Sequence, residues 1–476
     1  MAVSIITQQP WENTLSAESN IIFTVSNDTA VGSQTKVKFC ADVHISDFAQ
    51  PNLNTTTYLI GTFKTTPNNE GVGMFDFSGV VSNYVSSDNI AANQCYFKSS
   101  QTSNYYPIHI IDGHSTPTNS CRNLGIRFYV EYANAQGVVE ADTSTEVDSD
   151  KYVVFNSYLK ETDVLSIANV AYTGINIGDF GFDYGKYFPV ATSGVSTKRY
   201  LTNAPTTQYA NSEDYGTLAW LSINSSSAND VRNMVITYYD DSGTISSADT
   251  VTNTMFTGGN LPWNTFADKQ MMFFGCFPGN LENWSTNYAN AVTAGLTYYT
   301  IQAYDDTTIP QASIRKMTIK LNCPDLKNYE SIRLCWLNQF GAWDYYTFTK
   351  RSIRTTSTKA TTYTQLEGTW NESRYRPQGF RGGKKGFRVN AVDRIRINTD
   401  FVSEDFNVMF EELTNSPEVY MLDGFQTDIA FSALNNYVTP VRLVTSNFTK
   451  KTNANDNLIQ YTFEIEKSRT LRTQSI

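Results

Sequence analysis

The chain has 476 residues, of which 40% are hydrophobic, 13% aromatic and only 17% charged, and its formal net charge is −10. This length predicts several domains that can each bury a core, and the abundance of Tyr (29) and Phe (28) favours half-buried strands and turn-rich loops over long helices. The acidic balance argues against a general nucleic-acid binder, and three His residues leave little material for His-dependent catalysis.

The first predicted domain is a β domain at residues 1–160. Strand-length apolar stretches alternate with turns rich in Asn, Asp and Gly, and we predict strands at Ile21–Val25, Val37–Ile45, Tyr58–Thr65 and Arg127–Tyr132. One short helical turn is expected over Gly79–Val85. Residues 1–150 are acidic, with 6 Lys and Arg against 15 Asp and Glu. The polar run Ala141–Tyr152 (ADTSTEVDSDKY) predicts an exposed loop.

The second predicted domain, residues 161–360, is a β-sandwich-like domain. Gly, Asp-Asp and Pro separate apolar stretches roughly 10–25 residues apart, a spacing typical of a sandwich or barrel. The predicted strands are Thr217–Ile223, Asn233–Tyr239, Met271–Phe277, Leu296–Ala303, Ser313–Leu321 and Ser331–Leu337. The last of these and Trp343–Phe348 predict a β-hairpin lined with aromatic residues.

The sign of the charge inverts in the third predicted segment, a basic Gly-rich arm at residues 361–400. Residues 350–400 contain 12 Lys and Arg against four acids. The run Arg374–Phe387 (RYRPQGFRGGKKGF) is too rich in glycine and cations for a regular element. It therefore predicts an exposed loop or arm.

Residues 401–476 predict a C-terminal domain with one helix and an antiparallel sheet. Ser403 is a plausible N-cap, and acids follow it in the first turn. Apolar residues then recur at helical spacing on one face, at Phe406, Met409, Phe410 and Leu413. Strands are predicted at Val419–Leu422, Pro440–Thr445 and Leu458–Glu466, the last with apolar residues at alternate positions.

The N-terminal sequence has neither the basic stretch nor the apolar stretch of a signal peptide, and no apolar run reaches membrane-spanning length. We therefore expect a protein made in a reducing cytoplasm and not inserted in a membrane. The cysteines form no CxxC pair, which favours buried thiols over a disulfide or a metal site. They are Cys40, Cys95, Cys121, Cys276, Cys323 and Cys335.

The search for catalytic chemistry predicts no active site, no cofactor and no metal. His109 and His114 flank Asp112, but no further ligands cluster near them in the sequence, so a structural role is favoured over a metal site. Asp241-Ser242-Gly243-Thr244 matches an aspartic-protease string, yet a second copy is absent and the segment follows a strand as a hairpin turn would. A glycan hydrolase with two carboxylates stays open as a weaker alternative.

The basic arm is the electrostatically distinctive feature of the chain. Its complement is the acidic N-terminal block of a second copy, which favours head-to-tail docking between subunits. A solvated loop and nucleic-acid binding by cations and stacked aromatics are the alternatives. The candidate interface residues are Arg374, Arg376, Arg381, Lys384 and Lys385.

Several stretches resemble the tail, baseplate and collar-ring structural proteins of tailed bacteriophages. They are NIIFTVS (Asn20–Ser26), KFCADVHI (Lys38–Ile45), TTPNNEGVGMFDFSGVVSNYV (Thr65–Val85), IRLCWLNQFGAWDYYTFTKRS (Ile332–Ser352) and a closing stretch with LTNSPEVYML, TPVRLVTSNFTKK and LIQYTFEIEKS. Together they cover about a quarter of the chain in colinear order.

The resemblance implies a non-enzymatic virion protein, a mainly β, multidomain subunit of an oligomeric ring that contacts itself and neighbouring tail, baseplate or neck proteins. No catalytic residue is transferred, because the family offers no catalytic motif. The alternative is a carbohydrate-binding receptor-recognition tail protein, whose aromatic side chains would stack on host sugars. Low charge and abundant aromatics agree with a surface that neighbours cover.

Overall fold

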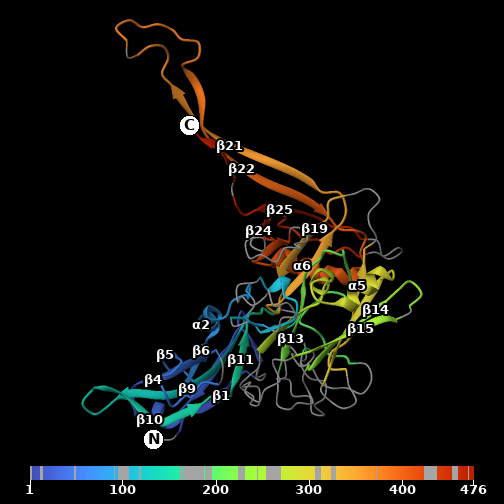
Figure 1. Cartoon of the computed structure of the whole chain (residues 1–476). Helices are drawn as coiled ribbons and strands as arrows, with labels where there is room; N and C mark the ends of the chain where they lie inside the picture. Colours follow the sequence, from blue (N-terminus) through green and yellow to red (C-terminus); the bar gives the residue numbers. More distant parts are fainter. Residues whose placement is uncertain are drawn as a thin grey trace. The chain divides into compact units, whose positions relative to one another are not determined.

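The computed structural model describes residues 3–10, 14–47, 50–90, 92–94, 107–116, 119–160, 163, 187, 196–222, 231–243, 245–253, 270–305, 312–322, 329–370, 372–422, 437–452, 459–469 and 471–475. The chain divides into two compact units, Met1–Asn322 with Leu337–Asp344 and Cys323–Trp336 with Tyr345–Ile476. Both are built mainly from strands, which confirms the predicted mainly β, multidomain fold with β-sandwich-like parts (Figure 1). The finer four-part division stays a prediction.

The N-terminal part of the first unit is a sandwich of two sheets. One sheet has the order β1 (Ile5–Gln8), β3 (Ile22–Ser26), β6 (Val72–Asp76). The other has the order β2 (Thr14–Ser16), β11 (Tyr152–Phe155), β9 (Cys121–Ala133), β4 (Thr35–Ser46), β5 (Leu59–Thr65), and β10 (Val139–Asp148) also pairs with β9.

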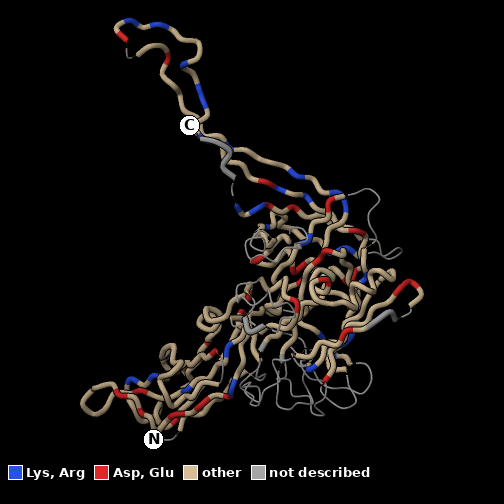
Figure 2. Tube along the Cα trace, viewed as in Figure 1, with Lys and Arg blue, Asp and Glu red and all other residues tan. Residues whose placement is uncertain are grey.

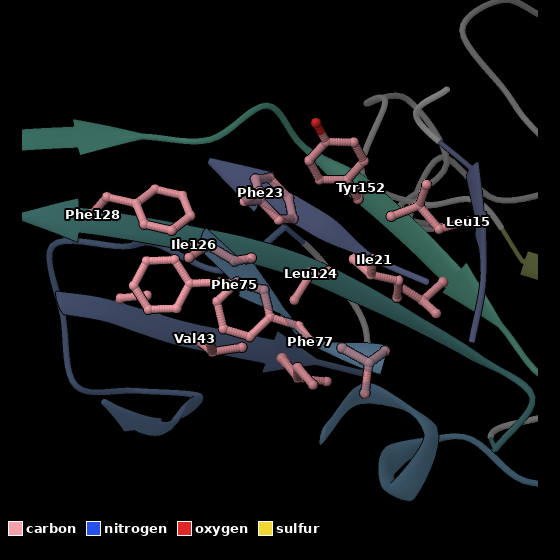
Figure 3. Packing of buried hydrophobic residues seen from close by; sticks show 14 of the residues in the cluster. Leu15, Ile21, Phe23, Val43, Phe75, Phe77, Leu124, Ile126, Phe128 and Tyr152 are labelled. Atoms are coloured by element: carbon pink, nitrogen blue, oxygen red, sulfur yellow. The ribbon is translucent and has the colours of Figure 1, made fainter. Parts of the chain in front are cut away.

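Aromatic side chains fill the space between these two sheets. Phe23 of β3 and Phe75 of β6 each lie 5.6 Å, centroid to centroid, from the ring of Phe128 on β9 (Figure 3). All three are buried, because alternate residues of each strand point to the same face. Period-two alternation is the signal that made these strands predictable.

Short helices border the sandwich. The helix α1 (Asp28–Ser33) starts where the Asn27 side chain accepts a hydrogen bond from the Ala30 N–H at 3.0 Å. The expected helical turn after residue 79 is confirmed as α2 (Ser78–Val81) and the 3-10 turn η1 (Ser82–Tyr84).

The loop predicted over Ala141–Tyr152 is wrong, because most of it is strand. β10 pairs antiparallel with β9 from Val139↔Ala133 to Asp148↔Arg127, and β11 begins at Tyr152. β10 is mostly exposed, so its charged side chains remain in contact with solvent. The acidic sequence of this strand therefore resembles that of a loop. Val147 packs against the core and fixes the orientation of the strand.

The remaining sheets of the first unit are formed mainly by the second predicted domain, and β7 and β8 of the first predicted domain join one of them. One has the order β12 (Thr207–Ala210), β18 (Met317–Leu321), β17 (Tyr298–Tyr304), β14 (Asn233–Tyr239), β15 (Ile245–Thr252). The other has the order β13 (Thr217–Ser222), β16 (Gln270–Gly275), β8 (His114–Thr116), β7 (Ala92–Gln94). Helical elements in the described part of this region include η2 (Ile108–Ile110), α4 (Pro278–Glu282) and α5 (Thr286–Thr293).

The second unit is built on one eight-stranded sheet. Its order is β20 (Trp343–Phe348), β19 (Ile332–Leu337), β23 (Val419–Leu422), β24 (Val438–Leu443), β25 (Thr462–Lys467), β22 (Gly383–Asn398), β21 (Ile353–Gln365), and β26 (Leu471–Ser475) also pairs with β22. The turn of the predicted aromatic hairpin, Leu337–Asp344, belongs to the first unit.

The predicted C-terminal helix and its sheet are confirmed. The 3-10 turn η6 (Glu404–Phe406) leads into α6 (Asn407–Asn415). The ring of Phe410 lies 5.0 Å from Tyr346 and 5.7 Å from Phe463, so the apolar helix face packs on the sheet. Ile459, Tyr461, Phe463 and Ile465 are all buried, as their alternation predicts.

The cysteines that the structure describes are free thiols. Cys40, Cys276 and Cys335 are buried and Cys121 is half-buried, while Cys95 and Cys323 lie outside the described residues. Burial raises the pKa of the Cys40 and Cys121 thiols to about 12. Within the described part of the chain, no helix has the length and apolarity needed to cross a membrane.

Candidate functional site: the tip of the β21–β22 ribbon

The strands β21 and β22 form a long antiparallel ribbon whose outer part stands clear of the sheet. Their pairing runs from Ile353↔Arg396 to Gln365↔Gly383. On the other side of β22, β25 pairs only with residues 394–398 and β26 only with residues 388–391 (Figure 1). On the side of residue 388 that leads to the loop, the ribbon therefore has two strands among the described residues. We call residues 361–388 the ribbon tip.

A β-bulge lies at the base of the ribbon tip. Thr361 pairs with Arg388 and Thr362 pairs with Gly386, so Phe387 has no partner across the ladder. A bulge of this kind bends the strand and redirects the side chain of the extra residue. The Phe387 ring is directed to Tyr363, with a centroid distance of 6.4 Å and an edge-on geometry.

The loop that closes the ribbon is organised around the Thr369 side chain. Its hydroxyl donates to the carbonyl oxygen of Arg374 at 3.0 Å and accepts from the Arg376 N–H at 2.9 Å. The Thr369 N–H also donates to the Arg376 carbonyl oxygen at 3.2 Å. Because Thr369 is only 2% exposed, these bonds are shielded from water and hold the loop in one shape.

Two glycines make the tight backbone path of this loop possible. Gly368 has φ +66°, and a Cβ there would lie 2.3 Å from the Tyr375 ring. Gly382 has φ +94°, and a Cβ there would lie 2.4 Å from the side chain of Glu367. Both the left-handed φ and the close approach require glycine.

The ordered loop displays large apolar side chains to solvent. The exposed members are Leu366, Trp370, Tyr375, Phe380 and Phe387, with exposed fractions between 51% and 72%. Apolar groups gathered in this way on a surface usually mark an interaction site, and Trp and Tyr are the commonest anchors of protein interfaces.

The five basic residues predicted from the sequence are all in the ribbon tip (Figure 2). Arg374 and Arg376 are exposed in the loop, and the Arg381 guanidinium lies 5.8 Å from the Phe380 ring centroid. Lys384 is exposed, and the Lys385 ammonium donates to the Phe380 carbonyl oxygen at 3.0 Å. The predicted loop is correct for the described residues up to Gly382 and wrong for 383–387, which begin β22.

Ion pairing differs between the base of the ribbon and its tip. At the base, the Lys350 ammonium pairs with Asp400, the Arg354 guanidinium with Glu330 and the Arg394 guanidinium with Glu466. Among the residues that the structure describes, the five tip cations form no ion pair. The sequence from 366 to 388 contains six Lys and Arg and two acids, so the tip presents an excess of positive charge without carboxylate partners.

The two histidines considered as metal ligands, His109 and His114, pack against aromatic rings. The His114 ring lies 4.7 Å from Phe274 and 5.8 Å from Trp220, and burial lowers its pKa to about 3, so it is neutral. The His109 ring packs edge-on against Trp343 at 4.9 Å. No three potential metal ligands cluster within the described ranges.

The described residues of the protease-like string, 241–243, belong to a turn, and Thr244 lies outside the described residues. Gly243 has φ +77° and lies between β14 and β15, and the Asp240 side chain accepts from the Ser242 N–H at 3.0 Å. Sequence reasoning missed the organising role of Thr369 and the display of Trp370 and Phe380. The signal that could have predicted the exposure of these two side chains is the presence of aromatic residues in a glycine-rich, polar stretch.

A second feature of the same unit is a shallow cavity of about 330 Å³ beside α6. It is lined by Glu411, Thr414, Asn415, Ser446, Phe448 and Lys450. The Lys450 ammonium pairs with the Glu411 carboxylate at 3.0 Å, and the Phe448 ring stacks on Tyr461 at 5.1 Å.

Comparisons with known proteins leave the family of the chain open. No protein-family model matches the sequence, and no curated protein matches it. A solved structure with some similarity is the native conformation of alpha-2-macroglobulin from E. coli, at 8% identity and a TM-score of 0.17. The match covers 83% of this chain, which spans about a fifth (21%) of that structure. Similarity this low carries no conclusion about fold or function.

Proposed function

We propose that the chain is a non-enzymatic structural subunit that assembles with copies of itself into a ring through the ribbon tip. The observation that carries this proposal is the ribbon tip itself, a loop with exposed aromatic side chains among cations that form no ion pair with the described residues. The sequence resemblance further supports a ring of the tail, baseplate or collar of a tailed bacteriophage, located in the virion and next to other virion proteins.

The shape of the ribbon tip favours a binding role over that of a solvated loop. Thr369 and two left-handed glycines hold the loop in one conformation before any partner arrives. A preformed contact surface loses less conformational entropy on binding than a disordered one. Exposed Trp370 and Phe380 would then gain free energy when a neighbouring surface covers them.

The geometry of the remaining candidate groups also supports a non-enzymatic role. His109 and His114 are buried in aromatic surroundings, and residues 241–243 of the protease-like string belong to the turn between β14 and β15. Each of these groups serves packing or a turn in the described structure. The proposal therefore rests on assembly, with no cofactor and no catalytic residue.

The test is the mass and shape of the purified protein by light scattering and negative-stain imaging. In the informative variant, Asn-Gly replaces residues 366–382 and joins Gln365 to Gly383, which already face each other across the ladder. We expect closed rings from the natural chain and monomers from the variant, with the same melting temperature. Rings of unchanged mass in the variant, or a natural chain that stays monomeric at high concentration, would refute the proposal.

Saccharide binding by a receptor-recognition protein is the second candidate function, and the cavity beside α6 favours it. An aromatic face with adjacent carboxylate, amide, hydroxyl and ammonium groups suits a polyhydroxylated ligand. We expect saturable binding on a glycan array that Phe448→Ala abolishes, with Val292→Ser, an exposed apolar site elsewhere, as the control. Equal binding by the Phe448→Ala variant would exclude this cavity.

A further inference from the structure

We infer that the partner of the ribbon tip is the acidic hairpin formed by β9 and β10 in a second copy of the chain. We call residues 134–150, which are the turn and the strand β10 of this hairpin without β9, the acidic hairpin. This inference rests on the proposed function and specifies the surface that receives the ribbon tip. Three properties of the two surfaces carry it: their charge, their exposed apolar residues and the open backbone edge of each.

The charges of the two surfaces are complementary. Residues 134–150 contain five acids and no Lys or Arg, against the six cations and two acids of residues 366–388. Arg127 pairs with Glu146 and Asp148, which leaves three other carboxylates. Glu140 accepts from Asn134 and Asp142 from Ser144, while Asp150 accepts from Gln9; none of these donors is charged.

An exposed apolar pair directly precedes Glu140 and Asp142 in the acidic hairpin. Val138 and Val139 are 56% and 48% exposed at the end of the hairpin. The backbone N–H groups of Gln136 and Val138 both donate to the Asn134 side chain at 3.0 Å, so the turn that presents these valines is ordered. Protein interfaces combine exposed apolar residues with charged ones, and the ribbon tip likewise has exposed aromatic residues beside charges of the opposite sign.

Each surface also has an unpaired strand edge. β21 pairs only with β22, and β10 only with β9, among the strands that the structure describes. An open edge presents backbone N–H and C=O groups that can pair with another chain. The free edge of β10 is clearest over residues 139–142, because the Thr145 carbonyl oxygen already accepts from the Ser4 N–H at 3.0 Å.

A second copy fits these observations better than a nucleic acid does. The chain as a whole has a net charge of −10, which repels phosphate at long range. Every copy carries one tip and one hairpin, so the contact can repeat head to tail as a heterologous contact. Repetition of a heterologous contact generates a ring when the rotation closes.

Charge reversal tests the inference with an internal rescue. The tip variant carries Arg374→Glu, Arg376→Glu and Lys384→Glu; the hairpin variant carries Glu140→Lys, Asp142→Lys and Asp150→Lys. We expect each variant to weaken self-association at least tenfold by light scattering or sedimentation. We expect assembly to return in a chain that carries both sets and in an equimolar mixture of the two single variants. The control is Lys316→Glu with Lys320→Glu and Arg351→Glu, cations exposed elsewhere, and it should assemble normally.

The outcomes separate this inference from the proposed function. A natural chain that never self-associates refutes both. If only the tip variant loses assembly, the ring proposal stands and the acidic hairpin is refuted as the partner of the tip. The acidic hairpin is also refuted if the combined charge reversals fail to restore assembly in chains whose melting temperatures are unchanged. Tight binding of single-stranded DNA that the tip variant loses, without any self-association, would assign the ribbon tip to nucleic acid instead.

A cysteine pair provides a measurement that does not depend on charge. Copies with Phe380→Cys and copies with Val138→Cys are given tags of different size and mixed under mild oxidation. We expect a disulfide between differently tagged chains, and only the background level with Val292→Cys in place of Val138→Cys. A chain that carries both Phe380→Cys and Val138→Cys is tested as well. A disulfide that forms only within this chain, and never between chains, would refute the inference.

Discussion

The shape of the ribbon tip should depend on one hydroxyl group, that of Thr369. Thr369→Val preserves the volume and β-branching of the side chain while removing both hydrogen bonds of Oγ1, to the Arg374 carbonyl oxygen and from the Arg376 N–H. The ladder of β21 and β22 and every tip cation remain. The variant therefore changes the conformation of the loop without changing its charge.

The expected magnitude follows from these two bonds. A net hydrogen bond contributes about 0.5–1.5 kcal/mol, and a buried group left without a partner costs about 1–3 kcal/mol. Since Thr369 is only 2% exposed, water replaces the lost partners poorly. A local destabilisation of about 2–3 kcal/mol follows, which corresponds to roughly a 30- to 150-fold rise in the open population of the loop.

Amide hydrogen exchange measures this population directly. The N–H groups of Thr369 and Arg376 should exchange faster by that factor in Thr369→Val, while amides in the ladder near Thr358 should keep their rates. Thr369→Ser retains the hydroxyl and should stay within a few-fold of the natural chain. Exchange in Thr369→Val that equals the natural rate, or equal acceleration in both variants, would show that the hydroxyl does not organise the loop.

Three further predictions concern the scaffold. Phe128→Ala should lower the free energy of unfolding of the first unit by about 3–5 kcal/mol in chemical denaturation, because it empties the centre of the sandwich; a loss below about 1 kcal/mol would contradict this packing. Gly341→Ala should destabilise the chain far more than Gly137→Ala. Both glycines have positive φ, but a Cβ at position 341 would lie 2.0 Å from a carbonyl oxygen, whereas a Cβ at position 137 would meet no neighbouring atom. Equal melting temperatures of the two variants would refute this steric argument. The hydrogen bond from Arg442 lowers the pKa of Glu466, so the carboxylate stabilises the fold above the unfolded pKa of about 4.3, and this contribution is lost as pH falls through the folded pKa. Glu466→Gln should therefore be modestly less stable than the natural chain at neutral pH and should lose less stability on acidification. Parallel curves of stability against pH for the two proteins would contradict this prediction.

Sequence periodicity was sufficient where an element has one buried face. The alternation from Ile459 to Ile465 and the helical spacing from Phe406 to Leu413 both require a single face against the core; the helix is where it was expected, and the strand begins at Thr462, later than predicted. Periodicity does not specify which strands pair. The antiparallel pairing of β8 with β16 and the parallel pairing of β12 with β18 join segments more than 100 residues apart, and no local pattern encodes them.

Exposed strands were the elements that the sequence could not reveal. β10 and the outer part of β22 are mostly solvated, so charged and glycine-rich stretches there resemble loops although the backbone is paired. Composition did indicate the cations of the candidate site. Its shape depends on Thr369, and a threonine that forms hydrogen bonds within a loop looks in sequence like any other in a Thr-rich segment.

The separation of charge between the two surfaces also determines which kind of assembly the proposed contact would permit. Two ribbon tips would repel each other, since each carries an excess of cations, and two acidic hairpins would repel each other for the opposite reason. Only the pairing of a tip with a hairpin is attractive. This charge pattern disfavours a two-fold dimer that places tip against tip or hairpin against hairpin, and tip–hairpin contacts repeated head to tail close into a ring. The open edge of β21, which would otherwise invite indiscriminate strand pairing, is then directed to an acidic partner by the cations beside it.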